Sequence, residues 1–115
     1  MQWDKRLTGR REFEAVCSHG RSWSNNLVVL RVLPNDLGPS RYGFAVGKRL
    51  GGAVVRNRVK RRLREAVRLT ATKDGWDMVF IARQAAAGAD YHALRRATEE
   101  LLARAQLLSN GRKEP

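Results

Sequence analysis

Residues 56–64 read RNRVKRRLR and place six cationic side chains within nine residues, with no carboxylate among them. At about 100° per residue, the side chains suited to face a core fall within one arc of a helix. They are Val55, Val59, Leu63, Ala66, Val67 and Thr70. The cations fill the remaining face, where like charges repel each other. The sequence therefore predicts a helix over residues 53–70 that docks on a core and binds an anion along its outer face.

A basic run is often only a solvated surface, and the last predicted helix, residues 90–108, has the charge balance typical of one. In that helix, three arginines each lie four residues from a glutamate, the spacing at which opposite charges on a helix can pair. The residues concerned are Arg95, Arg96, Arg104, Glu99 and Glu100. The central helix contains only Glu65, and arginine outnumbers lysine there. Guanidinium groups suit bidentate phosphate contacts, so the pattern favours a polyanionic ligand over solvent.

The composition supports the same partner. The net charge is +12, and nine of the 23 lysines and arginines lie within residues 48–68. With 115 residues the chain is expected to form a single domain over residues 1–115, frayed after about residue 109. Cys17 is the only cysteine, which excludes an internal disulfide and favours a reducing, cytoplasmic location. A basic amphipathic helix can also lie on an anionic membrane, but its apolar residues here are small, which disfavours that use.

The rest of the pattern predicts an α/β (α+β) two-layer sandwich with the order α-β-β-β-α-β-α and one four-stranded sheet. A short helix over residues 10–18 ends at Gly20, and strands are expected over residues 21–24, 27–33, 41–49 and 76–83. Residues 34–40 form a loop, residues 85–89 form a loose connection, and Asp90 caps the last helix.

The strand predicted over residues 41–49 alternates between bulky and small side chains. Tyr42, Phe44 and Val46 are bulky and are expected to pack on the core. The small residues of the other face are Gly43, Ala45 and Gly47. We expect this second face to be bare.

No pattern predicts catalysis by the protein itself. The residues considered are Asp74, Asp77, Glu99, Glu100, His19, His92 and Cys17. The acidic pairs lie at a turn and in a charge-paired helix, the histidines are isolated, and the cysteine has no nearby base. Gly47 and Gly52 have the spacing of a phosphate loop, but Ala-Val follows where Lys-Ser/Thr is required. We therefore expect neither catalytic nor metal-binding residues, and no tightly bound cofactor.

Residues 44–69, FAVGKRLGGAVVRNRVKRRLREAVRL, resemble the protein subunit of bacterial ribonuclease P. The segments RREFEAV, YGFAVGK, DMVFIAR and DYHAL extend the resemblance over nearly the whole chain. The resemblance implies a small sandwich related to a ribosomal-protein domain and to domain IV of an elongation factor. It also implies a left-handed crossover from the third strand through the basic helix, although about 98% of such connections are right-handed.

In that family the catalyst is an RNA, which requires Mg²⁺ and removes the 5′ leader from precursor tRNA. The resemblance implies that the protein binds the catalytic RNA through its RNR helix and needs no protein partner. It also implies that the single-stranded leader lies in a cleft between the first helix and the sheet. The RNA-binding residues carried over, with the neighbouring cations, are Lys48, Arg49, Arg56, Asn57, Arg58, Lys60, Arg61, Arg62, Arg64 and Arg68. The leader-cleft residues are Phe13, Cys17, Arg31, Ala45 and Gly47.

Two departures from the family pattern concern the cleft. Relatives often have an aromatic residue at the position of Cys17, and an aromatic or bulky residue at those of Val28 and Arg31. Phe13 remains as a stacking platform, or else as a plain core residue, and Arg31 offers a cation in place of a ring. The alternative functions are a ribosomal or other structural RNA-binding protein, which needs no open cleft, and a protein-only nuclease, which the scattered acids disfavour.

Overall fold

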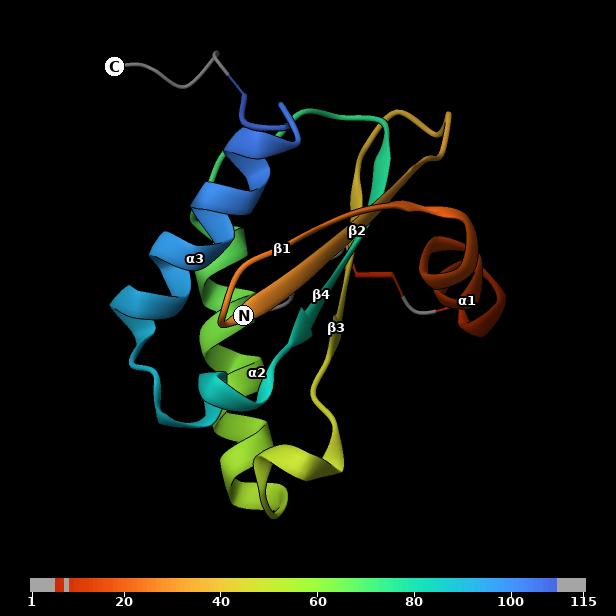
Figure 1. The fold of residues 1–115 in the computed structure, drawn as a ribbon. Helices are drawn as coiled ribbons and strands as arrows, with labels where there is room; N and C mark the ends of the chain where they lie inside the picture. Colours follow the sequence, from red (N-terminus) through yellow and green to blue (C-terminus); the bar gives the residue numbers. More distant parts are fainter. Residues whose placement is uncertain (1–5, 8, 110–115) are drawn as a thin grey trace.

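The computed structural model describes residues 6, 7 and 9–109 (Figure 1). The elements are α1 (Arg10–His19), β1 (Arg21–Ser24), β2 (Val28–Pro34), β3 (Arg41–Ala45), η1 (Lys48–Leu50), α2 (Ala53–Arg68), β4 (Trp76–Ala82), η2 (Gln84–Gly88) and α3 (Tyr91–Arg104). The predicted order is confirmed, with two short 3₁₀ helices, η1 and η2, added to it. The fraying expected after about residue 109 falls outside the described residues.

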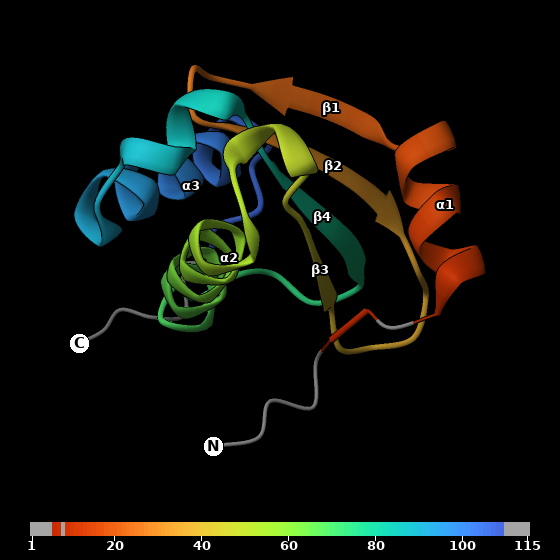
Figure 2. The same cartoon turned by 90° about the horizontal axis from the view of Figure 1, so that it is seen from below.

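The four strands form one sheet in the order β1-β2-β4-β3. β2 pairs antiparallel with both β1 and β4, whereas β3 and β4 are parallel neighbours joined through α2. Figures 1 and 2 together show that this crossover is left-handed, because β4 lies to the left of β3 when the strands point upwards and are viewed from α2. The crossover implied by the family resemblance is therefore present.

The main core lies between the sheet and the layer formed by α2 and α3 (Figure 2). From the sheet, Leu30, Met78 and Phe80 are fully buried in it. Most of the arc predicted for α2 packs against them. Val59, Leu63, Ala66 and Val67 are buried, and Val55 and Thr70 are half-buried. Periodicity alone was therefore sufficient to orient this helix.

The opposite face of the sheet is covered by α1, which contacts β2 and β4. Val16 and Val79 are buried there in a second, smaller apolar cluster. At the end of α1, a Cβ added to Gly20 would lie 2.5 Å from the carbonyl oxygen of Val16 and 2.7 Å from that of Val32. Only glycine leaves room for this close approach of α1 to β2.

Several predicted boundaries were wrong. β3 ends at Ala45 instead of residue 49, because its partner β4 ends at Ala82 and the register places Ala45 opposite Ile81. α2 ends at Arg68, two residues early, and α3 ends at Arg104, before Gln106 adopts a positive φ of 61°.

The expected loose connection over residues 85–89 is largely the helix η2, with Ala86 fully buried against the main core. Two of the three charge pairings expected in the last helix were also wrong, because neither Arg96 nor Arg104 forms an ion pair with Glu100 in the described structure. Arg95 and Glu99 do form an ion pair, at 3.2 Å, but Arg104 donates to the carbonyl oxygen of Ser24 instead of pairing with Glu100. α3 is therefore tied to β1 as well as balanced within itself.

Candidate nucleic-acid interface

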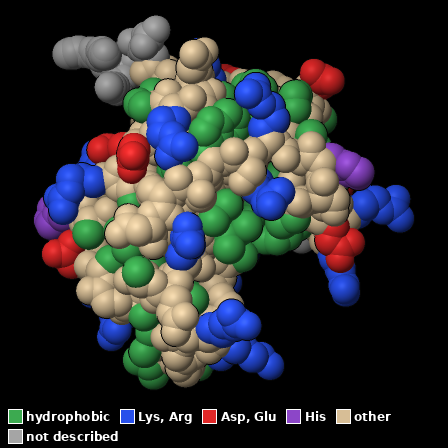
Figure 3. Space-filling model, in the orientation of Figure 1, with side chains coloured by type: hydrophobic (Ala, Val, Ile, Leu, Met, Phe, Trp, Pro, Cys, Tyr) green, Lys and Arg blue, Asp and Glu red, His purple; other side chains and the backbone are tan. Residues whose placement is uncertain are grey.

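The outer face of α2 carries the cationic run as predicted. Asn57 and Arg61 are exposed, and the other cations of the run are half-buried with their stems along the helix. The half-buried residues are Arg56, Arg58, Lys60, Arg62, Arg64 and Arg68. Lys48 and Arg49 are exposed on η1, directly before the helix. In Figure 3, lysine and arginine side chains are spread over the visible face, and some of them lie at the lower end of the molecule, where η1 leads into α2.

Three arginines of this run are engaged within the protein. Arg56 donates from Nε to the carbonyl oxygen of Gly51 at 3.2 Å, at the start of α2. Arg62 donates from Nη1 to the carbonyl oxygen of Ala89 at 2.7 Å, which ties α2 to the segment before α3. Arg68 forms an ion pair with Glu65. The hydrogen bonds of this pair lower the pKa of the Glu65 carboxyl and raise that of the Arg68 guanidinium. The RNA contacts predicted for Arg62 and Arg68 remain predictions, and both groups have a structural role in addition.

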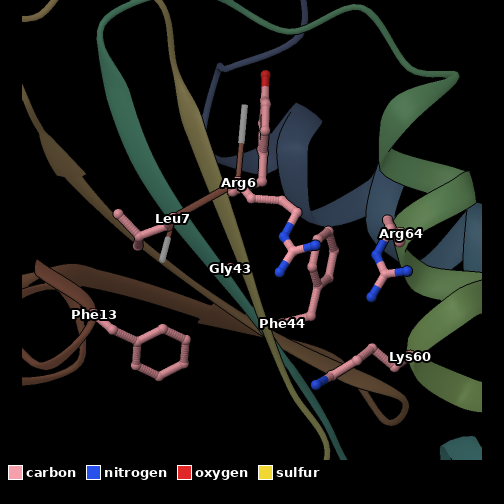
Figure 4. A pocket seen from close by; sticks show the side chains of 8 residues that line it. Arg6, Leu7, Phe13, Gly43, Phe44, Lys60 and Arg64 are labelled. Carbon is pink, nitrogen blue, oxygen red and sulfur yellow. The ribbon is translucent and has the colours of Figure 1, made fainter. Parts of the chain in front are cut away.

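A pocket of about 200 Å³ opens between α2, the edge of β3 and the segment before α1 (Figure 4). It is lined by Arg6, Leu7, Phe13, Tyr42, Gly43, Phe44, Lys60 and Arg64. The pocket brings Phe13 of the predicted cleft together with Lys60 and Arg64 of the predicted RNA-binding helix. Of its other five residues, Gly43 was expected on the bare face of the strand, Tyr42 and Phe44 were assigned to the core, and Arg6 and Leu7 were missed from the sequence. The local pattern of Arg6 and Leu7 gives no signal of a pocket.

The small-residue face of β3 is not bare along its whole length. A Cβ added at Gly43 would lie 2.9 Å from Cε2 of Phe13 and 3.6 Å from Cβ of Leu7, so these side chains cover that position. Ala45 is half-buried and Gly47 is exposed. An added Cβ at Gly47 would meet no described atom within 4 Å. The open part of this face therefore begins at Ala45 and continues past the end of the strand.

The remaining cleft residues lie on the α1 side. Arg31 donates from Nη1 to the carbonyl oxygen of Cys17 at 3.0 Å, which links β2 to α1. Cys17 is half-buried beside Phe13 in the smaller apolar cluster. In the sheet, both Arg31 and Gly43 stand opposite Val79 in register. The predicted cleft residues therefore share one face of the sheet, with α1 at one side and the end of β3 at the other.

Several carboxylates of the described residues form ion pairs with arginines of the protein. Asp77 is buried and accepts two hydrogen bonds from Arg41, at 2.9 and 2.7 Å, and one from Asn35 at 2.8 Å. The hydrogen bonds that Arg41 donates to Asp77 raise the pKa of the Arg41 guanidinium. Within residues 6, 7 and 9–109, no group of three or more His, Cys, Asp or Glu is placed to hold a metal ion. In the same part of the chain, no helix is long and apolar enough to cross a membrane.

A basic face that binds RNA through phosphates gives a salt-dependent affinity. If α2 makes about four phosphate contacts to unpaired RNA, log K should fall with log salt at a slope near −3, since each contact contributes about −0.7. Filter binding of the purified protein to a single-stranded oligonucleotide over a range of KCl concentrations measures the slope. A salt-independent affinity would show that the cations of α2 are only solvated.

Comparisons with known proteins agree with this geometry. The family model described as Ribonuclease P matches residues 1–106. The ribonuclease P protein component of Dehalococcoides mccartyi is 47% identical over 109 residues, which cover 95% of this chain and 91% of that protein. The solved ribonuclease P protein of Staphylococcus aureus superposes with a TM-score of 0.83 at 28% identity, covering 93% of this chain and 100% of that one.

A second structure of the S. aureus protein, described as a mutant with defective mRNA degradation activity, gives a TM-score of 0.82 at 30% identity and covers 90% of each chain. The predicted fold is thus that of solved ribonuclease P proteins. The family match extends over the cationic run of α2 and all the cleft positions. This chain belongs to the ribonuclease P protein family, the protein components of the ribonucleoprotein endonuclease that matures the 5′ ends of tRNA.

Proposed function

We propose that this chain binds the catalytic RNA of ribonuclease P through the outer face of α2 and receives the 5′ leader of precursor tRNA in the cleft between α1 and β3. One observation carries the proposal: Phe13, Lys60 and Arg64 line one pocket at the edge of β3. A single-stranded leader presents bases for stacking and phosphates for cations, and this pocket offers both. A purely structural RNA-binding protein needs the basic helix alone, so the continuity of helix and cleft favours a leader-binding protein.

We assign the cleavage itself, and the Mg²⁺ it requires, to the RNA subunit. Carboxylates that a metal-dependent protein nuclease would use are held in ion pairs here: Asp77 with Arg41, and Glu99 with Arg95. The protein contributes binding energy toward the leader. The sequence has one cysteine, Cys17, and so uses no internal disulfide, which supports a location in the reducing cytoplasm. We also propose that the protein needs no obligate protein partner.

The test compares 5′ maturation of precursor tRNA by the protein alone, by the cognate RNA subunit alone and by both together, at low Mg²⁺. We expect no cleavage by the protein alone and faster cleavage by the pair than by the RNA. An unstructured mRNA fragment serves as a second substrate for the RNA-free protein, because the S. aureus mutant structure is described by its defective mRNA degradation activity. A protein that only binds structural RNA would not accelerate maturation. Metal-dependent cleavage that persists in repurified, RNA-free protein would contradict the assignment of the chemistry.

A further inference from the structure

We propose that Arg6, Lys60 and Arg64 together form a clamp for one RNA phosphodiester, seated beside the ring of Phe44. The inference rests on the proposed function, because it takes RNA as the ligand of the pocket. It adds Arg6, a residue outside the cationic run, and it assigns one shared role to three cations that the sequence places in two separate segments.

The clamp is built on backbone that is held in place. Arg6 forms a parallel β-bridge with Tyr42, and the N–H of Leu7 donates to the carbonyl oxygen of Tyr42 at 2.6 Å. Residues 6 and 7 therefore lie along the edge of β3 that β4 does not occupy. Lys60 and Arg64 stand four residues apart on α2, one turn of the same helix face. Figure 4 shows the side chains of Arg6, Lys60 and Arg64 extending into the space around Phe44.

The charge of the pocket is one-sided. Its lining contains three cations and no carboxylate. The Nε of Arg64 is also buried, and no hydrogen-bond partner for it exists among the described residues. A buried N–H that has lost water without gaining a partner is costly, and three neighbouring cations repel one another. An anion bound by the guanidinium groups and the ammonium relieves both penalties.

The floor of the pocket favours a nucleotide over a free anion. Phe44 stacks on Phe80 with ring centroids 5.7 Å apart and an interplanar angle of 18°. Because Phe80 is fully buried in the main core, the Phe44 ring is a fixed apolar surface beside the three cations. A phosphodiester with its attached sugar or base matches this combination of charge and ring. The phosphodiester comes from the leader of precursor tRNA or from the catalytic RNA, which share this chemistry.

The first experiment measures binding of precursor tRNA by the holoenzyme with Arg6→Ala, Arg64→Ala and the double variant. The control is Arg96→Ala, which removes the same charge from an exposed position on α3 outside the pocket. Each single clamp variant should weaken binding roughly 10- to 100-fold, the value expected for a charge-assisted contact. The double variant should lose less than the product of the single losses, because both side chains hold the same phosphate. Circular dichroism checks that each variant folds, and the backbone pairing of Arg6 does not depend on its side chain.

The second experiment locates the phosphate. Leaders that carry one neutral methylphosphonate at successive positions should show one position where wild-type holoenzyme loses affinity and the Arg6→Ala holoenzyme does not. If the clamp instead holds the catalytic RNA, Arg6→Ala should weaken binding to that RNA without tRNA, and the leader scan should be flat. Losses for Arg6→Ala equal to those for Arg96→Ala in both assays would overturn the clamp. Equal binding of precursor and mature tRNA by wild-type holoenzyme would reject the proposed leader cleft. Binding of the Arg6→Ala protein to the catalytic RNA alone would then still show whether the clamp holds a phosphate of that RNA.

Discussion

Truncation of Leu63 to alanine should lower the free energy of unfolding by about 2–5 kcal/mol. The Leu63 side chain is fully buried between α2, the sheet and α3, where neighbouring side chains cannot close the cavity completely. Arg61→Ala, two residues earlier on the exposed face, should change the free energy by no more than about 0.5 kcal/mol. Urea denaturation followed by circular dichroism measures both values.

For RNA binding, Arg61→Ala should have the larger effect and Leu63→Ala the smaller one. Arg61→Ala should weaken binding to the RNA subunit, because it removes a cation from the proposed interface, whereas folded Leu63→Ala protein should bind nearly as wild type. Measurements at a temperature where both variants are folded separate the two effects. Similar losses of stability for the two variants would mean that the faces of α2 are misassigned.

The second large loss of stability is expected for Asp77→Ala, at about 3 kcal/mol. Removal of one member of a buried ion pair costs roughly 3–5 kcal/mol, and the lower end applies because 29% of the Arg41 side chain is exposed. The variant also leaves Asn35 without the carboxylate that accepts its amide hydrogen at 2.8 Å. Thermal and urea unfolding give the change in stability.

Asp74→Ala is the matched control, because it removes an exposed carboxylate three residues earlier, in the turn that leads into β4. It should leave the unfolding midpoint nearly unchanged. Hydrogen exchange should show the loss for Asp77→Ala concentrated where β3 begins and where the loop of residues 34–40 joins it. A midpoint as high as that of the Asp74→Ala protein would show that the Arg41–Asp77 pair adds no net stability.

The parts of the fold that were predictable are those set by neighbours in the chain. The buried arc of α2 follows from its period, and the Asp90 side chain caps α3 by accepting from the Ala93 N–H at 2.8 Å. Gly20 likewise ends α1 as predicted. In each case the determining contacts lie within a few residues, so the pattern contains them.

The features that were missed depend on partners far away in the sequence. Asp77 meets Arg41 and Asn35 from 36 and 42 residues away, so it resembled an ordinary turn acid. Arg6 reaches β3 through a single bridge, which has no periodicity to detect. The end of β3 is likewise set by the length of β4. Of the site, the charge run revealed Lys60 and Arg64, and Phe13 came from the family resemblance, but only the fold brings the three into one pocket.

The position of β4 has a consequence for synthesis on the ribosome. β4 is the last strand to be translated, yet it lies between β2 and β3 and pairs with both. Until residues 76–82 have left the exit tunnel, β2 and β3 each have an open edge, and the apolar arc of α2 lacks the central strand of its sheet. Nascent chains with open strand edges are prone to aggregation. In a chain that stops before Trp76, β1 and β2 can still pair, but nothing joins β3 to them, so the sheet is completed only after β4 has been translated.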